Sequence, residues 1–106
     1  MTPSTANVRG RYHPRVEANL MVLVHLKERT VLAKAKDLSM AGLFLLAHPA
    51  DSLRKLSLSV SLPEAGEFTT DCIIVRREAN GVALEFEGLD WDHFLVLARY
   101  LHPRLP

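Results

Sequence analysis

The sequence DLSMAG, residues 37–42, places a carboxylate, a hydroxyl and a glycine within six residues, where a strand-like pattern ends. A carboxylate accepts hydrogen bonds from N–H groups, and a hydroxyl accepts or donates them. Asp37 and Ser39 are two residues apart, so alternation along an extended strand predicts that both side chains point to the same face. Gly42 suits a tight turn or a close approach of the backbone to a ligand. This stretch predicts a binding site for a molecule that carries N–H donors.

A second stretch, RYHPR, carries two arginines four positions apart, Arg11 and Arg15, before the first strand-like segment. An arginine fork matches phosphate, reads O6 and N7 of guanine bidentately, and can stack on a base. The two arginines could therefore clamp a guanine nucleotide from one side while the Asp37–Ser39 pair holds it from the other. Alone, RxxxR is usually solvated charge and DxSxxG a common turn composition, so the prediction rests on their joint occurrence.

Residues 1–16 carry three arginines and no acidic residue, together with several turn-forming residues. Pro14 disfavours a helix and pushes the residue before it towards extended backbone. We therefore expect residues 1–16 to form a flexible basic arm and residues 17–106 to form the folded body. Because the arm is polar and has few apolar anchors, we expect it to become ordered only when ligand binds.

Six short segments behind the arm have the apolar or alternating pattern of β-strands. They are residues 18–26, 30–38, 42–47, 56–62, 68–78 and 81–86. Alternation in the second segment predicts Asp37 on the face of Ala33 and Ala35, with Leu38 on the opposite face. Asn80-Gly81 predicts a tight hairpin between the last two strands.

The period changes to a helical one over residues 90–102, with Asp90 or Asp92 as the cap and Pro103 as the stop. Four apolar residues are expected to pack on the strands: Phe94, Leu97, Ala98 and Leu101. Three others could leave apolar surface for a partner or a second copy: Trp91, Val96 and Tyr100. The predicted fold is all-β with one C-terminal helix: a six-stranded antiparallel barrel or a closed sandwich, because closure removes exposed strand edges.

Composition excludes several classes of function. The 106 residues fit one domain, and a net charge of +1 argues against binding to DNA or to an anionic membrane. Apolar runs are too short for membrane insertion, and the N-terminus lacks a secretory signal. A single cysteine, Cys72, favours a cytoplasmic location. Binding of single-stranded nucleic acid on the sheet would need exposed aromatic residues, whereas Phe44, Phe68 and Phe86 are expected in the core.

Catalytic motifs are absent from the sequence. Ser39 lacks the GxSxG context of a nucleophile, and there is no glycine-rich phosphate loop. The five histidines, at positions 13, 25, 48, 93 and 102, lack metal-ligand spacing. Cys72 lies within an apolar strand, where a buried, inert thiol is expected. We therefore expect no enzyme activity, no metal and no cofactor.

The combination Arg11-Tyr-His-Pro-Arg15 with Asp37-Leu-Ser39-Met-Ala-Gly42 resembles the RxxxR and (D/N)xSxxG motifs of the PilZ domain. The resemblance continues through GLFLLA, VRRE, GVALEFEGLD and ARYL, and covers residues 9–102. PilZ domains are bacterial receptors for cyclic di-GMP, built as a six-stranded antiparallel barrel with a C-terminal helix. The resemblance therefore implies the same fold that the residue pattern predicts.

The resemblance also implies roles for single residues. Arg11 and Arg15 would grip the guanine Hoogsteen edges and the phosphates of cyclic di-GMP as the arm folds over it. Asp37 and Ser39 would hold a guanine from the barrel surface. Gly42 would leave room for the base.

Two further arginines match the family pattern more loosely. Arg9 would add a phosphate contact, and Arg76 falls where some relatives place a side chain against the ligand. Many members have two consecutive arginines at the start of the first motif, whereas here Gly10 stands beside Arg11. One bound ligand and an intercalated pair therefore both stay open.

The implied function is a cyclic di-GMP receptor or adaptor that signals to an unidentified protein partner, with a homodimer as a further option. The alternative is a PilZ-like interaction module, related to pili or motility, that does not bind the nucleotide.

Overall fold

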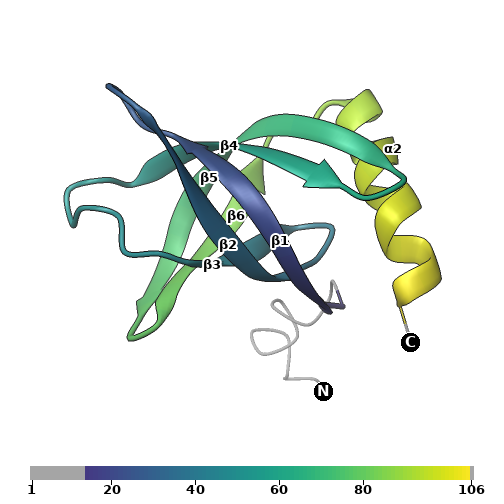
Figure 1. Ribbon diagram of the computed structural model, residues 1–106, viewed down its shortest axis with the longest axis horizontal. Helices are drawn as coiled ribbons and strands as arrows, with labels where there is room; N and C mark the ends of the chain where they lie inside the picture. The colour runs from purple at the N-terminus through teal and green to yellow at the C-terminus, as the bar shows by residue number, and fades with distance from the viewer. Residues whose placement is uncertain (1–13, 106) are drawn as a thin grey trace, which may run out of the picture.

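The computed structural model describes residues 14–105, which form a closed antiparallel β-barrel with one helix at its flank (Figure 1). The strands are β1 (Val16–His25), β2 (Thr30–Leu38), β3 (Gly42–Leu46), β4 (Lys55–Leu62), β5 (Gly66–Glu78) and β6 (Gly81–Glu87). Their order around the barrel is β1-β2-β3-β6-β5-β4, and β4 pairs with β1 to close it. The predicted barrel is confirmed.

The first strand begins earlier than the sequence pattern predicts. Val16 pairs with Leu38 and Glu17 pairs with Asp37, so β1 starts at Val16 rather than at residue 18. The charge of Glu17 hides this start, because an outward position on a strand tolerates a polar side chain. Residues 1–13, which include Arg9 and Arg11, lie outside the described residues.

The barrel interior is filled by the alternating apolar residues of every strand. β4 shows the pattern most simply: its leucines and its valine are buried, and its serines lie between them on the outer side. Burial of each leucine contributes about 1.5–3 kcal/mol. Phe68 is buried and meets Phe86 edge to face, with ring centroids 5.6 Å apart. Phe44 is also buried, so none of the three phenylalanines of the strands offers an open ring for stacking a base.

A β-bulge in β2 overturns the predicted alternation. Ala35 pairs with Leu45 and Asp37 with Phe44, so two residues, Lys36 and Asp37, lie opposite one. The extra residue turns Leu38 into the core, where it is 0% exposed, and turns Asp37 to the outer side. The prediction that Asp37 shares the face of Ala33 and Ala35 is therefore wrong, because strict alternation holds only in a strand without an inserted residue.

The helix α2 (Trp91–Leu101) packs on β5 and β4, and a short 3-10 helix, η1 (His102–Arg104), follows it. Asp90 caps α2: its Oδ1 accepts a hydrogen bond of 2.9 Å from the backbone N–H of His93. The predicted cap is confirmed. Within residues 14–105, the structure contains no helix with the length and apolar character needed to cross a membrane.

The face that α2 buries is rotated from the predicted one. Leu97 and Leu101 are buried as predicted, but Tyr100 is buried too and Val96 packs against the core. Phe94 is instead partly exposed beside Trp91. Arg104 lies over the Tyr100 ring, 3.9 Å from its centroid, and this contact helps to keep the ring against the barrel.

Candidate functional site

The turn between β2 and β3 is held by the Ser39 side chain. Its Oγ accepts hydrogen bonds from the backbone N–H groups of Ala41 (3.1 Å) and Gly42 (3.2 Å). The Ser39 backbone N–H donates to the Gly42 carbonyl (2.9 Å), and the Ala41 carbonyl accepts from the Phe86 N–H on β6 (2.7 Å). Ser39 is 3% exposed and lies beyond the end of β2, so strand alternation does not determine where its hydroxyl points. Its described contacts fix the shape of the turn.

Gly42 lies where the backbone of β3 comes unusually close to that of its neighbour β6. A Cβ at this position would lie 1.9 Å from the Leu84 carbonyl oxygen, a distance that no real side chain can occupy. The glycine is therefore required by the approach of two backbones, whether or not a ligand also lies against it.

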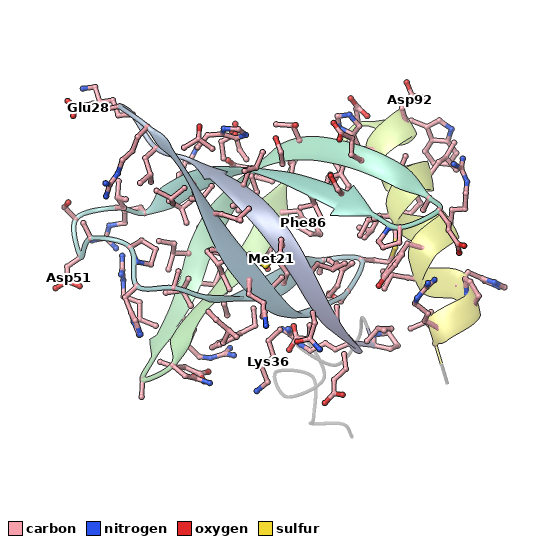
Figure 2. All side chains as sticks on the ribbon, in the orientation of Figure 1. Met21, Glu28, Lys36, Asp51, Phe86 and Asp92 are labelled. Atoms are coloured by element: carbon pink, nitrogen blue, oxygen red, sulfur yellow. The ribbon has the colours of Figure 1, made fainter. Side chains whose placement is uncertain are left out.

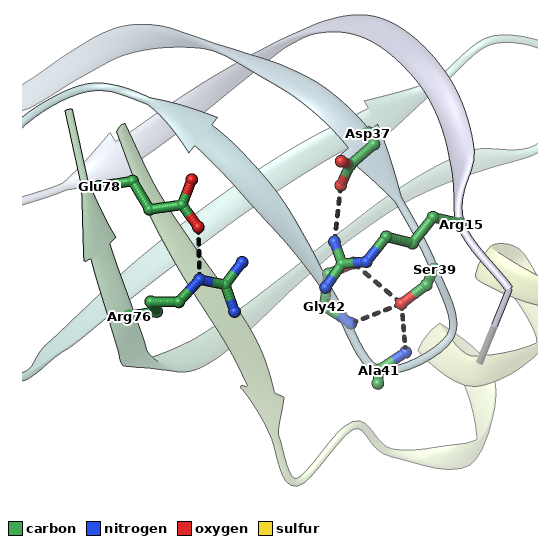
Figure 3. A network of polar contacts seen from close by, with 7 residues as sticks. All are labelled: Arg15, Asp37, Ser39, Ala41, Gly42, Arg76 and Glu78. Carbon is green, nitrogen blue, oxygen red and sulfur yellow. Dashed lines mark hydrogen bonds and ion pairs between the residues drawn. The ribbon is translucent and has the colours of Figure 1, made fainter. Parts of the chain in front are cut away.

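Arg15 and Asp37 form the polar pair in front of this turn, as Figure 3 shows. The Arg15 Nη1 donates to Asp37 Oδ1 at 2.9 Å, and the two side chains are 41% and 19% exposed. Arg15 directly precedes β1, and the pairing of Glu17 with Asp37 brings the start of β1 beside the end of β2. The structure thus unites one residue of each predicted motif on the outer surface of the barrel.

Arg76 lies apart from this pair but in the same transverse row. Cross-strand partners run from Asp37 to Phe44 on β3, to Ala83 on β6 and to Arg76 on β5. Three strand spacings separate the ends of this row by about 14 Å. The Arg76 Nε donates to a carboxylate oxygen of Glu78, and Figure 3 shows this pair to the left of Arg15 and Asp37.

Bulges gather along this row. Besides the one before Asp37, the register shifts in β5 between Ile74 and Arg76, and in β1 between Glu17 and Leu20. Bulges re-aim side chains at barrel rims and binding sites, because the inserted residue breaks the inside–outside alternation. They place Asp37 and Arg76 on the outer side of an otherwise regular barrel.

Sequence reasoning did not identify Lys36 as part of the site. The Lys36 ammonium lies 5.8 Å from the centroid of the Phe44 ring, next to Asp37. The only signal in the sequence is its position beside Asp37, because the bulge that brings both side chains to the outer side is not visible in the alternation pattern. Two cations, Arg15 before β1 and Lys36 on β2, therefore lie beside the Asp37 carboxylate, while Arg76 on β5 lies apart from it.

Cys72 and the histidines take no part in this site. Cys72 is 0% exposed, and burial, with smaller effects from Asp71 and Glu87, raises the pKa of its thiol to about 12. The expected burial of the thiol is confirmed. Among the described side chains there is no group of three or more His, Cys, Asp or Glu that could hold a metal ion.

Comparisons with known proteins agree with this architecture. The family model for the PilZ domain matches residues 10–102. No curated protein sequence matches the chain.

Several solved structures share the fold at low sequence identity, and three of them are described here. The PilZ domain of YcgR from Escherichia coli, solved with c-di-GMP, has a TM-score of 0.70 and 17% identity, over 87% of this chain and 88% of that one. The Bacillus subtilis inhibitor of motility, MotI/DgrA, has a TM-score of 0.72 and 19% identity, over 87% of this chain. The MrkH–c-di-GMP complex of K. pneumonia has a TM-score of 0.71 and 17% identity, over 86%. This chain spans about half of the latter two proteins, 49% of each.

Proposed function

The chain belongs to the PilZ domain family, and from that membership we propose that it is a cytoplasmic receptor for cyclic di-GMP rather than an enzyme. The observation that carries the proposal is the Asp37 carboxylate, turned outward by a bulge and paired with Arg15 in front of a turn fixed by Ser39. Two proteins of similar fold, YcgR and MrkH, were solved with c-di-GMP.

The Arg15–Asp37 pair would open to admit a guanine. The carboxylate accepts N–H donors from the Watson–Crick edge of the base, while the freed guanidinium reads O6 and N7 on its Hoogsteen edge. One half-exposed ion pair is worth about 0–1 kcal/mol, less than the several charge-assisted hydrogen bonds that replace it. Ser39 and Gly42 hold the turn in a shape that keeps the carboxylate accessible.

The other arginines would complete the site. Arg11, with Arg9 as a looser contact, would add phosphate and base contacts when the arm before Arg15 folds over the ligand. Arg76 would reach the ligand from the far end of the Asp37 row after it releases Glu78. The ordered arm would then present a new surface to a protein partner, which is how binding becomes a signal. Arm ordering subtracts from the contact energy, so the affinity need not be high.

The test is isothermal titration calorimetry of the protein with cyclic di-GMP, with GTP and cyclic di-AMP as competing nucleotides. Selective binding is expected, and the molar ratio distinguishes one bound ligand from two. Arg15→Ala should weaken binding by about 1–3 kcal/mol, because it removes a bidentate donor. Arg29→Ala, an exposed arginine on the β1–β2 turn, is the matched control and should bind like wild type.

Flat heats for the wild-type protein, repeated by a second binding method, would refute the receptor proposal and leave the interaction module in its place. Ordering of the arm has its own test, limited digestion with trypsin. Saturating cyclic di-GMP should slow cleavage after Arg9 and Arg11. Equal cleavage rates with and without bound ligand would show that the arm does not fold over it.

A further inference from the structure

Two exposed apolar surfaces, one on the barrel and one on α2, have no role in the proposed site. One, the sheet face, lies on the outer side of β1, β2 and β3 and consists of the partly or largely exposed side chains Met21, Leu23, Leu32 and Leu46. These residues are contiguous: Leu23 pairs with Leu32, while Lys34 pairs with Met21 on one side and with Leu46 on the other. The sheet face is thus an apolar patch with a lysine in its middle and Lys36 at its edge.

The other surface, the helix face, lies on the first turns of α2 and consists of Trp91, Phe94 and Leu95. Positions i, i+3 and i+4 share one side of a helix, so the three side chains form a single stripe. The Trp91 and Phe94 rings are stacked, with centroids 5.6 Å apart and planes at 12°, and Trp91 is 68% exposed. Asp90 and Asp92 flank the stripe on its two sides.

We propose that these surfaces bind each other between two copies of the chain, with the helix face of one copy docked head to tail on the sheet face of the next. The charges beside each face favour contact between unlike faces, since the sheet face carries lysines and the helix face carries aspartates. A dimer joined through two sheet faces would bring Lys34 and Lys36 against the same lysines of the other copy. Two helix faces would likewise oppose their aspartates. Only the contact between unlike faces combines apolar burial with opposite charges.

The two faces cannot meet within one chain. Figure 2 shows Met21 and Lys36 on the β1–β2 side of the barrel, whereas Asp92 projects from the first turn of α2, at the other side of the view. The basic arm does not suit the sheet face as an occupant, because Arg9 and Arg11 would face Lys34 and Lys36. An aromatic pair of this exposure is typical of an interface centre, where tryptophan contributes strongly to binding.

A head-to-tail contact leaves one free face at each end, so assembly continues unless the geometry closes a ring. Each face has few side chains, so the contact is expected to be small and the association reversible. Analytical ultracentrifugation without nucleotide should therefore show an average mass that rises with protein concentration. A single monomeric species at every concentration up to the solubility limit would overturn the proposal.

Two single variants identify the faces. Leu32→Ser disables the sheet face and Trp91→Ala the helix face, and each should weaken association by at least about tenfold. Neither side chain is buried, so both variants are expected to fold. Val75→Ser is the matched control, because Val75 is an exposed apolar residue on β5 outside both faces. Unchanged association in either variant would exclude its face.

Mixing the two variants distinguishes contact between unlike faces from dimers joined through two sheet faces or two helix faces. The Leu32→Ser protein keeps a working helix face, and the Trp91→Ala protein keeps a working sheet face. Each should associate weakly alone, but the mixture should form a one-to-one complex with wild-type affinity. Trp91 is the only tryptophan of the chain, so its emission in the Leu32→Ser protein reports this docking and should shift to the blue. A mixture that stays monomeric would refute the unlike-face contact.

Charge reversal gives a second, independent test. Lys34→Glu and Asp92→Lys should each weaken association, whereas the double variant should recover most of it because the opposite charges again face each other. A double variant weaker than both singles would show that the charges do not meet.

Discussion

Gly42 begins β3 at one end of the barrel, and Gly81 begins β6 at the other. Both are packed against backbone: a Cβ would lie 1.9 Å from the Leu84 carbonyl oxygen at Gly42 and 2.1 Å from the Leu45 carbonyl oxygen at Gly81. We refer to the Asp37 end, which holds the Arg15–Asp37 pair, and the His25 end, which holds the β1–β2 turn and the β3–β4 loop (Figure 1). The two ends share this backbone requirement and differ in their side chains.

The His25 end contains a cavity among the described residues. A cavity of about 640 Å³ lies there, lined by the β1–β2 turn and the loop before β4. His25 is tied to the outer surface of neighbouring strands, with Nδ1 3.2 Å from Thr30 Oγ1 and Nε2 2.7 Å from Ser59 Oγ. The Asp37 end offers instead a carboxylate aimed outward from the end of β2, in front of a turn held by the Ser39 side chain. The polar atoms of Arg15 and Asp37 are therefore what identify the candidate site at the Asp37 end.

The largest effect is expected where the two ends are alike. Gly42→Ala and Gly81→Ala should each lower the free energy of unfolding by about 3 kcal/mol, because the added methyl group overlaps a carbonyl of a paired strand. Urea unfolding measures the loss. Gly88→Ala is the control: its Cβ would meet nothing within 4 Å, and its cost of about 1 kcal/mol comes from the φ of +71° alone. A mild effect at Gly42 alone would show that its backbone contact can relax.

The next largest effect is expected on ligand binding, which should respond to a substitution at the Asp37 end and not to one at the His25 end. Asp37→Asn replaces an acceptor-only group by one that also donates, so cyclic di-GMP binding should weaken by about 2 kcal/mol, roughly thirtyfold. Stability should change by no more than about 1 kcal/mol, because the Arg15–Asp37 pair is partly exposed. Glu28→Gln, at the His25 end, should leave calorimetric binding unchanged. If Glu28→Gln weakened binding and Asp37→Asn did not, the ligand site would belong to the opposite end.

A smaller difference is expected between two serines. Ser39→Ala removes the acceptor of two backbone N–H groups and should cost about 1–2 kcal/mol in thermal or urea unfolding. Ser52→Ala, in the exposed loop of the His25 end, should cost less than about 0.5 kcal/mol. Equal costs would mean that the turn before β3 keeps its shape without the hydroxyl.

The smallest effect is the pH dependence of stability that comes from Cys72, on β5 between the two ends of the barrel. Below pH 9 the Cys72 thiol is protonated in the folded and unfolded chains, so it adds no pH dependence. Between pH 9.0, its ordinary pKa, and a folded pKa of about 12, only the unfolded chain loses the proton, and the free energy of unfolding falls. The loss from this group at pH 10 is about 1.4 kcal/mol.

Urea unfolding of the wild-type protein and of Cys72→Ala at pH 8 and pH 10 isolates this contribution. The variant should be less stable at both pH values but should lose less stability between them. Equal losses would show that the thiol is not held in its protonated form by the fold.

Thiol labelling of Cys72 in the two glycine variants would also report whether either end opens without the rest of the barrel.

The fold was predictable from the sequence because most strands follow simple alternation. The serine–leucine pattern of β4, the Asn80-Gly81 hairpin and the Asp90 cap each express one local rule, and each agrees with the structure. The rotation of α2 was not predictable, since several apolar stripes exist on this helix and the barrel selects the one with Leu97 and Tyr100. Local periodicity identifies a helix, but the surface it packs on chooses the buried side.

The candidate site was predictable in its residues and not in its geometry. Arg15 and Asp37 were expected on opposite sides of a ligand, and the structure instead joins them in an ion pair. Their placement depends on bulges, which leave no mark in the alternation pattern because an inserted residue can have any side chain. Gly42 was expected to give room for a base, and its contact with Leu84 could not be read from one strand alone.

The bulge in β2 also limits how this site can be transplanted. A protein engineer who grafted the DLSMAG segment onto a regular hairpin would keep every residue of the motif and lose its geometry. If Lys36 took part in regular alternation and formed no bulge, the carboxylate of Asp37 would point into the core and Leu38 would point to water. The transferable unit is therefore the motif together with the irregular strand that sets which of its side chains face outward.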